Sequence, residues 1–153
     1  MNIFYLDNNL KLNAQYMVDK HIVKMPLESA QLLTSTLYFT GQEDKSPYKL
    51  THKNHPCSVW CRQSLSNWLF LKELALEICY EYTYRYGKIH KCQGVIESLP
   101  IPNLNDIGFT VLPNCMDKEY IISNDTITNY RNYYKNGKNH LAKWTKRDKP
   151  FWC

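Results

Sequence analysis

The strongest constraint on the fold is a long helical repeat of apolar residues near the middle of the chain. Between Cys57 and Tyr86, apolar residues recur three and four positions apart, and Gly87 then supplies a left-handed helix cap. The apolar positions are Val59, Trp60, Leu65, Trp68, Leu69, Leu71, Leu74, Leu76 and Ile78. A helix with so much apolar surface has to bury it against other elements. The segment therefore predicts one long helix at the centre of a helical protein.

Two further helices are expected, one on each side of this segment. Asn13 is a candidate N-cap for a helix that continues to about Leu37, with Pro26 producing a kink or dividing it into two abutting helices. Asp125 is the candidate N-cap of a last helix that stops at Gly137.

The remaining segments predict connections. Residues 1–6 are expected to form a short strand or an extended arm, and the proline-bearing residues 41–56 and 98–124 to be mostly irregular. The prediction is a mainly α protein, a single compact domain over residues 1–153 with about three principal helices and long irregular connections.

Composition excludes several classes of protein. Hydrophobic residues make up 44% and charged residues 22%, which is typical of a globular chain. The mean hydropathy is −0.51, and no long uncharged apolar run is present, which argues against a membrane protein. The first residues lack the basic start of a signal peptide, so the six cysteines are expected to be reduced thiols or metal ligands rather than disulfides. We expect a cytoplasmic monomer.

Positive charge is concentrated at the C-terminal end. Residues 125–153 contain seven basic and two acidic residues and thus account for the whole net charge of +5. Aromatic residues alternate with the cations, and such a pattern is typical of nucleic-acid binding. The candidate phosphate contacts are Arg131, Lys135, Lys138 and Lys143. The alternative is a helix with buried rings and solvated lysines.

A polar stripe marks the first expected helix. His21, Lys24 and Glu28 follow one another at helical spacings, with Lys20 beside them. A carboxylate can stabilise a cationic sugar, and an amine can attack an anomeric carbon. The alternative is an ordinary solvated face that carries a Lys24–Glu28 ion pair.

A second polar cluster precedes the long helix. Lys53, Asn54 and His55, together with Arg62, are candidate phosphate contacts near a helix start. A zinc site would need His52, His55, Cys57 and Cys61, whose spacing does not match a standard structural zinc site. We therefore expect no metal and no cofactor, and cysteines that behave as small buried hydrophobic residues.

These motifs together resemble a known family. The residues that carry the resemblance are Asp19, Lys20, His21, Lys24, Glu28, Gln31, Leu32 and Leu33, then Asn54, His55, Pro56 and Trp60, and finally Tyr84, Arg85, Tyr86 and Gly87. Over residues 14–92 the chain resembles the pyrimidine-dimer DNA glycosylases (endonuclease V-like) of phages and bacteria. The resemblance implies a phage-encoded repair enzyme that acts on damaged duplex DNA, with Glu28 as the catalytic carboxylate and His21 as its DNA-facing neighbour.

The sequence offers more than one candidate for the nucleophile. In that family it is the α-amine exposed when the initiator methionine is removed. Here Asn2 is too large for the usual removal, so the candidate amines are those of Met1, Lys20 and Lys24. Two other functions stay open, namely a non-catalytic nucleic-acid-binding protein and a phage enzyme that acts on modified DNA bases.

Overall fold

The computed structural model describes all residues 1–153 and confirms a mainly α protein without strands. Six α-helices follow one another: α1 (Leu10–Tyr16), α2 (Asp19–Leu37), α3 (Pro56–Gln63), α4 (Leu65–Tyr86), α5 (Gln93–Glu97) and α6 (Thr126–Gly137). Short 3₁₀ turns lie at Glu43–Lys45, Lys118–Tyr120 and Asn139–Leu141. No helix has the length and apolar character needed to cross a membrane.

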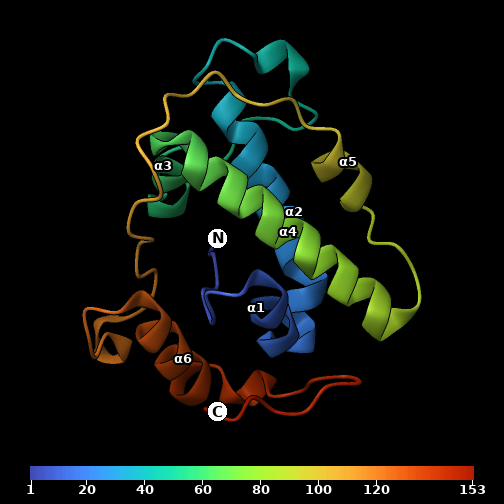
Figure 1. The fold of residues 1–153 in the computed structure, drawn as a ribbon, viewed down its shortest axis with the longest axis vertical. Coiled ribbons are helices and arrows are strands. Elements are labelled where there is room, and N and C mark those ends of the chain that lie inside the picture. Colours follow the sequence, from blue (N-terminus) through green and yellow to red (C-terminus); the bar gives the residue numbers. More distant parts are fainter.

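The two longest helices, α2 and α4, pack across each other and form the centre of the molecule (Figure 1). Ile22, Leu33, Trp68, Leu71 and Ile78 are fully or almost fully buried between these helices and their neighbours. The apolar periodicity of the sequence therefore corresponds to the core side of each helix.

The prediction of one continuous helix over 57–86 is wrong at a single residue. Ser64 is extended, with φ −154° and ψ 145°, and separates α3 from α4. Asp106 explains the break, because its Oδ1 accepts hydrogen bonds from the Ser64 and Ser66 hydroxyls at 3.0 and 2.6 Å. The irregular segment 98–124 is thus attached at the junction between the two helices.

The prediction for the first helix is wrong in three details. The helix expected from Asn13 to Leu37 is divided at the extended residues Met17 and Val18, where α1 ends and α2 begins. Asn13 is not an N-cap but lies buried within α1, and Asn9 caps that helix. Pro26 does not divide α2, which continues through it, since residues on both sides of the proline are buried in the core. The caps at Asp125 and Gly87 are confirmed.

The N-terminal residues form an extended arm that runs into the middle of the fold (Figure 1). Ile3, Phe4 and Leu6 are buried. The side chain of Asn13 holds the arm, because it accepts the Asp7 N–H at 3.1 Å and donates to the Phe4 carbonyl at 3.0 Å. The arm therefore carries the start of the chain to an interior position.

A buried ion-pair network joins the C-terminal segment to the helices. Arg85, whose side chain is fully buried, donates to Glu81 at 3.0 Å and to Asp19 at 2.9 Å. Arg147 donates to Glu81 at 2.9 Å. Burial alone would raise the pKa of Asp19 and Glu81, but the hydrogen bonds from Thr145, Arg85 and Arg147 lower both pKa values below their ordinary range.

Removal of Arg85 should destabilise the fold severely. We expect Arg85→Met to lower the free energy of unfolding by about 3–5 kcal/mol, because two buried carboxylates lose a partner. Urea denaturation followed by circular dichroism measures this loss. Arg62→Met, a matched change at a half-buried arginine, should cost about 1 kcal/mol or less. Equal losses in the two variants would contradict a structural role for the network.

Candidate active site

The α-amine of Met1 and the carboxylate of Glu28 meet at the inner end of the arm. The amine nitrogen lies 3.2 Å from Glu28 Oε1, and the two side chains are only 3% and 10% exposed. Both carboxylate oxygens are buried, and neither accepts a well-aligned hydrogen bond. Their partners are two cations, the Met1 amine and the Lys24 ammonium, which lies 3.3 Å from Oε2.

The neighbouring residue Asn2 fixes this amine in position. Its Nδ2 donates to the Cys115 carbonyl at 2.9 Å, and its Oδ1 accepts the Tyr130 hydroxyl at 2.7 Å. Tyr130 is buried in α6, and its hydroxyl also accepts the Cys115 N–H at 3.2 Å. The first residue of the chain is thereby held by α6 and by the segment that precedes it.

His21 lies beside the pair in a neutral state. Its ring stacks on Phe4 with a centroid separation of 4.1 Å, and Nδ1 contacts the Tyr134 hydroxyl at 2.5 Å. That hydroxyl accepts the Val18 N–H, so its own hydrogen is free to be donated to Nδ1. Burial, together with the charges of nearby lysines, lowers the pKa of His21 to about 3.

Two adjoining cavities open at the amine. One, of about 240 Å³, is lined by Met1, His21, Lys24, Glu28 and Lys138 among others. The second, of about 540 Å³, is lined on one side by His55 and on the other by the segment from Pro113 to Asp117. Met1, Cys115 and Tyr133 line both. The smaller cavity therefore combines one carboxylate with several cations, and it adjoins a larger cavity of ligand size.

The three candidate amines differ in their positions. Met1 is buried against Glu28, whereas the Lys24 side chain is 62% exposed and reaches Glu28 only with its end. Lys20 is exposed and lines neither cavity. The geometry favours the α-amine.

Of the candidate phosphate contacts in and after the loop before α3, only His55 lies at the site. His55 caps α3, lines the larger cavity and has its pKa lowered by burial and by the Met1 ammonium. Lys53 and Asn54 are exposed and line neither cavity. Arg62 bonds the Lys53 carbonyl at 2.7 Å and covers the Phe39 ring, so it is engaged within the chain.

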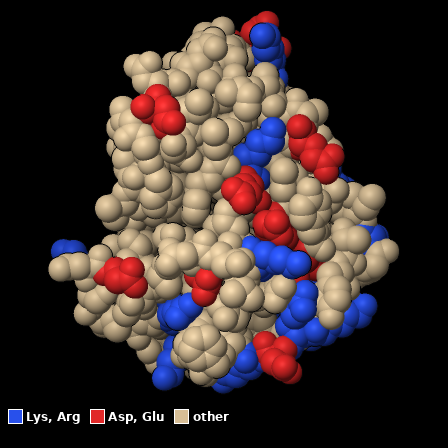
Figure 2. Space-filling view, viewed as in Figure 1, with Lys and Arg blue, Asp and Glu red and all other residues tan.

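The candidates in the C-terminal segment divide into two kinds. Arg131 donates to the Leu6 carbonyl at 2.8 Å and pairs with Asp7 at 3.0 Å, so its charge is used inside the protein. Lys135 and Lys143 are exposed, and Lys138 is half-buried at the smaller cavity. Lys and Arg side chains gather over the part of the surface formed by α6 and the C-terminal segment (Figure 2).

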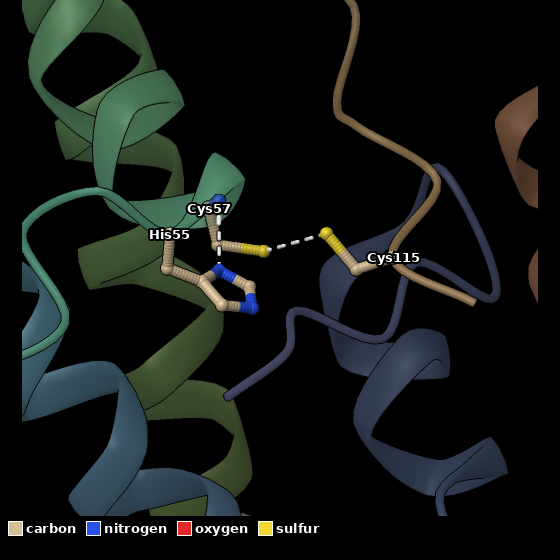
Figure 3. Close-up of side chains that lie close together, drawn as sticks. All are labelled: His55, Cys57 and Cys115. Carbon is tan, nitrogen blue, oxygen red and sulfur yellow. Dashed lines mark hydrogen bonds between the residues drawn. The ribbon is translucent and has the colours of Figure 1, made fainter. Parts of the chain in front are cut away.

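The four residues of the zinc alternative do not come together. His52 is exposed and bonded to Thr51, and Cys61 is buried beside Thr36. His55 and Cys57 instead lie next to Cys115, which the sequence did not single out (Figure 3). No local spacing could have identified Cys115, because it reaches the site through the irregular segment that precedes α6.

Comparison of the chain with protein-family models, curated proteins and solved structures found no match. The site is therefore interpreted from its own geometry.

The neutral state of buried His21 predicts a pH dependence of stability. Unfolded His21 takes up a proton near pH 6.5, whereas in the folded protein the pKa is about 3. Its stabilising contribution is thus complete above pH 6.5 and is lost as the pH falls toward 3. Between pH 7 and 5 this loss amounts to about 2 kcal/mol.

Urea denaturation at pH 7 and pH 5 checks this prediction. The loss of stability between pH 7 and pH 5 should be smaller in His21→Asn than in the wild type. His140→Asn, at an exposed position, should show the same loss as the wild type. The same loss in all three proteins would mean that folded His21 binds its proton normally.

Proposed function

We propose that the protein is a DNA glycosylase with AP-lyase activity that acts on damaged or modified duplex DNA, with the α-amine of Met1 as its nucleophile. The observation that carries this proposal is the buried pair of Met1 and Glu28, 3.2 Å apart at a cavity wall. An amine can act as a nucleophile at C1′ of a sugar, and a carboxylate beside it can stabilise the positive charge that develops there. The resemblance to pyrimidine-dimer glycosylases supports the same assignment of Glu28.

The proposed reaction begins when the Met1 ammonium loses a proton to solvent, while Glu28 remains a carboxylate. The free amine attacks C1′ of the target nucleotide, the bond from C1′ to the base breaks, and the base leaves. Glu28 stabilises the positive charge that develops on the sugar. The nitrogen then loses a second proton, and the C1′–O4′ bond breaks with protonation of O4′, which opens the sugar ring and gives an imine. The imine allows β-elimination of the 3′ phosphate, and its hydrolysis returns the amine.

Cations around the cavity suit a substrate with a phosphate backbone. Lys24 and Lys138 line the cavity that contains Glu28, and Lys135 and Lys149 continue the positive surface beyond Lys138. Tyr133 lines both cavities, with the Lys138 ammonium 5.1 Å from its ring centre. In the proposed complex the lysines contact phosphates, and the Tyr133 ring is available to an extruded base.

Borohydride trapping tests the reaction. Incubation with duplex DNA that contains an abasic site or a pyrimidine dimer should give a covalent adduct, which peptide mass spectrometry should locate at the Met1 amine. Two residues added before Met1 should abolish the adduct. Glu28→Gln should form it at least about 100-fold more slowly while retaining DNA affinity, since one stabilising charge is lost.

Matched lysine variants control the trapping experiment. Lys20→Ala and Lys24→Ala should both retain an adduct at the N-terminus. An adduct that disappears only in Lys24→Ala would assign the nucleophile to Lys24. No adduct on either substrate, under conditions where a known lyase reacts, would contradict the imine mechanism and favour a protein that only binds nucleic acid.

Salt dependence tests the binding surface. Replacement of both Lys135 and Lys138 by alanine should reduce the slope of log affinity against log salt by about 2, because each phosphate contact contributes about 0.9. The loss of affinity should be similar for any sequence, since phosphate contacts do not read bases. The paired control Lys45→Ala/Lys49→Ala, exposed at a site remote from α6 (Figure 1), should keep the wild-type slope. Equal slopes in the wild type and both double variants would show that Lys135 and Lys138 do not contact DNA phosphates.

A further inference from the structure

His55, Cys57 and Cys115 form a compact group of metal-ligand side chains beside the N-terminal amine. One ligand atom from each residue lies within 4.8 Å of those from the other two, and the two sulfur atoms are 3.5 Å apart (Figure 3). Cys57 is buried, whereas His55 and Cys115 are half-buried. The group is thus enclosed on one side and accessible on the other.

Two separate devices hold this group in place. His55 is the N-cap of α3, and its Nδ1 accepts the Cys57 N–H at 3.1 Å, so the short His55-Pro56-Cys57 turn keeps the imidazole next to the first thiol. Cys115 comes from the segment before α6, where Tyr130 and Asn2 bond its backbone N–H and carbonyl. Two thiols from distant parts of the chain are therefore brought together by fixed backbone.

We propose that His55, Cys57 and Cys115 bind one thiophilic divalent cation, for which Zn²⁺ is the best match, with one coordination position open to the cavity beside Met1. Two thiolates and one imidazole suit a tetrahedral zinc ion that keeps a fourth position for water or another ligand. Hard cations such as Mg²⁺ prefer oxygen ligands, which this group lacks.

The chain has to make two local adjustments when the ion binds. Both thiols lose their protons to solvent. The hydrogen bond that joins the Cys57 and Cys115 sulfur atoms is lost when both become thiolate ligands of the ion. The His55 ring rotates about its Cβ–Cγ bond and gives up the cap hydrogen bond to direct one nitrogen at the ion.

The open position faces the larger cavity, which His55, Cys115 and Met1 line together. This position is distinct from the Met1–Glu28 pair, and the inference does not depend on the proposed glycosylase reaction. A cation here would supply a second positive centre at the same cavity.

Cobalt titration of the full-length chain tests the site without DNA. The protein is purified under reducing conditions, treated with a chelator and titrated with Co²⁺, which shows thiolate-to-cobalt charge-transfer absorption when sulfur coordinates it. We expect one Co²⁺ per chain with this absorption, displaced by Zn²⁺. Zn²⁺ should also raise the Tm of the wild type.

Three variants and one control decide the outcome. Cys57→Ser, Cys115→Ser and His55→Asn should each weaken Co²⁺ binding at least about tenfold. Asparagine is also a good N-cap, so His55→Asn removes the imidazole and keeps a capping side chain. Cys153→Ser, at another half-buried thiol, should bind Co²⁺ like the wild type. If Cys57→Ser fails to fold, Co²⁺ binding by Cys115→Ser and His55→Asn still tests the site.

Two results would overturn the proposal. One is the absence of charge-transfer absorption in the reduced wild type. The other is an absorption that Cys115→Ser and His55→Asn both leave unchanged, because the ion would then be held elsewhere. A Cys57–Cys115 disulfide that persists in reductant and prevents Co²⁺ binding would also overturn the proposal, because it too would leave the charge-transfer absorption absent.

Discussion

The buried guanidinium of Arg85 connects three helices of the chain. It donates to Glu81 within its own helix, to Asp19 at the start of α2 and to the Gln15 carbonyl at the end of α1. Asp19 also accepts the Thr145 N–H and hydroxyl, and Glu81 binds Arg147. A fully buried charge of this kind is stable only when all of its donors find partners. This requirement fixes α1, α2, α4 and the C-terminal segment relative to one another.

The same constraint determines where the candidate site can form. Because Asp19 is held by Arg85, the first turn of α2, which contains His21, is fixed. Glu28 lies further along the same helix, and both residues line the cavity at the N-terminal arm. Asn13 in α1 holds that arm from the other side. Asp19 belongs to the motif that resembles the glycosylases, yet its contacts are structural. Part of such a motif can thus preserve the helix that presents the candidate site residues.

Local patterns predicted the helices well and their connections poorly. Apolar spacing located α2 and α4, and Asp125 and Gly87 marked real helix ends, because these signals depend on neighbouring residues. The break at Ser64 and the burial of Asn13 depend on Asp106 and on the arm, which are distant in sequence. The polar stripe similarly identified Glu28 and His21, but the positions of Met1 and Cys115 depend on Asn2 and Tyr130.

In the basic C-terminal segment the arginines and the lysines have different roles, which a count of charges does not distinguish. Its two arginines, Arg131 and Arg147, form ion pairs with Asp7 and Glu81, whereas no lysine of the segment forms an ion pair. Arginine suits such sites because its planar group makes several directed hydrogen bonds at once, while the ammonium of lysine is compact and strongly hydrated. The arginines therefore attach the segment to the N-terminal arm and to α4, and the lysines remain as its external charge. A surface built in this way carries positive potential past Lys138 to the cavity that contains Glu28, so that in the proposed function DNA attraction and attack on the sugar share one continuous face.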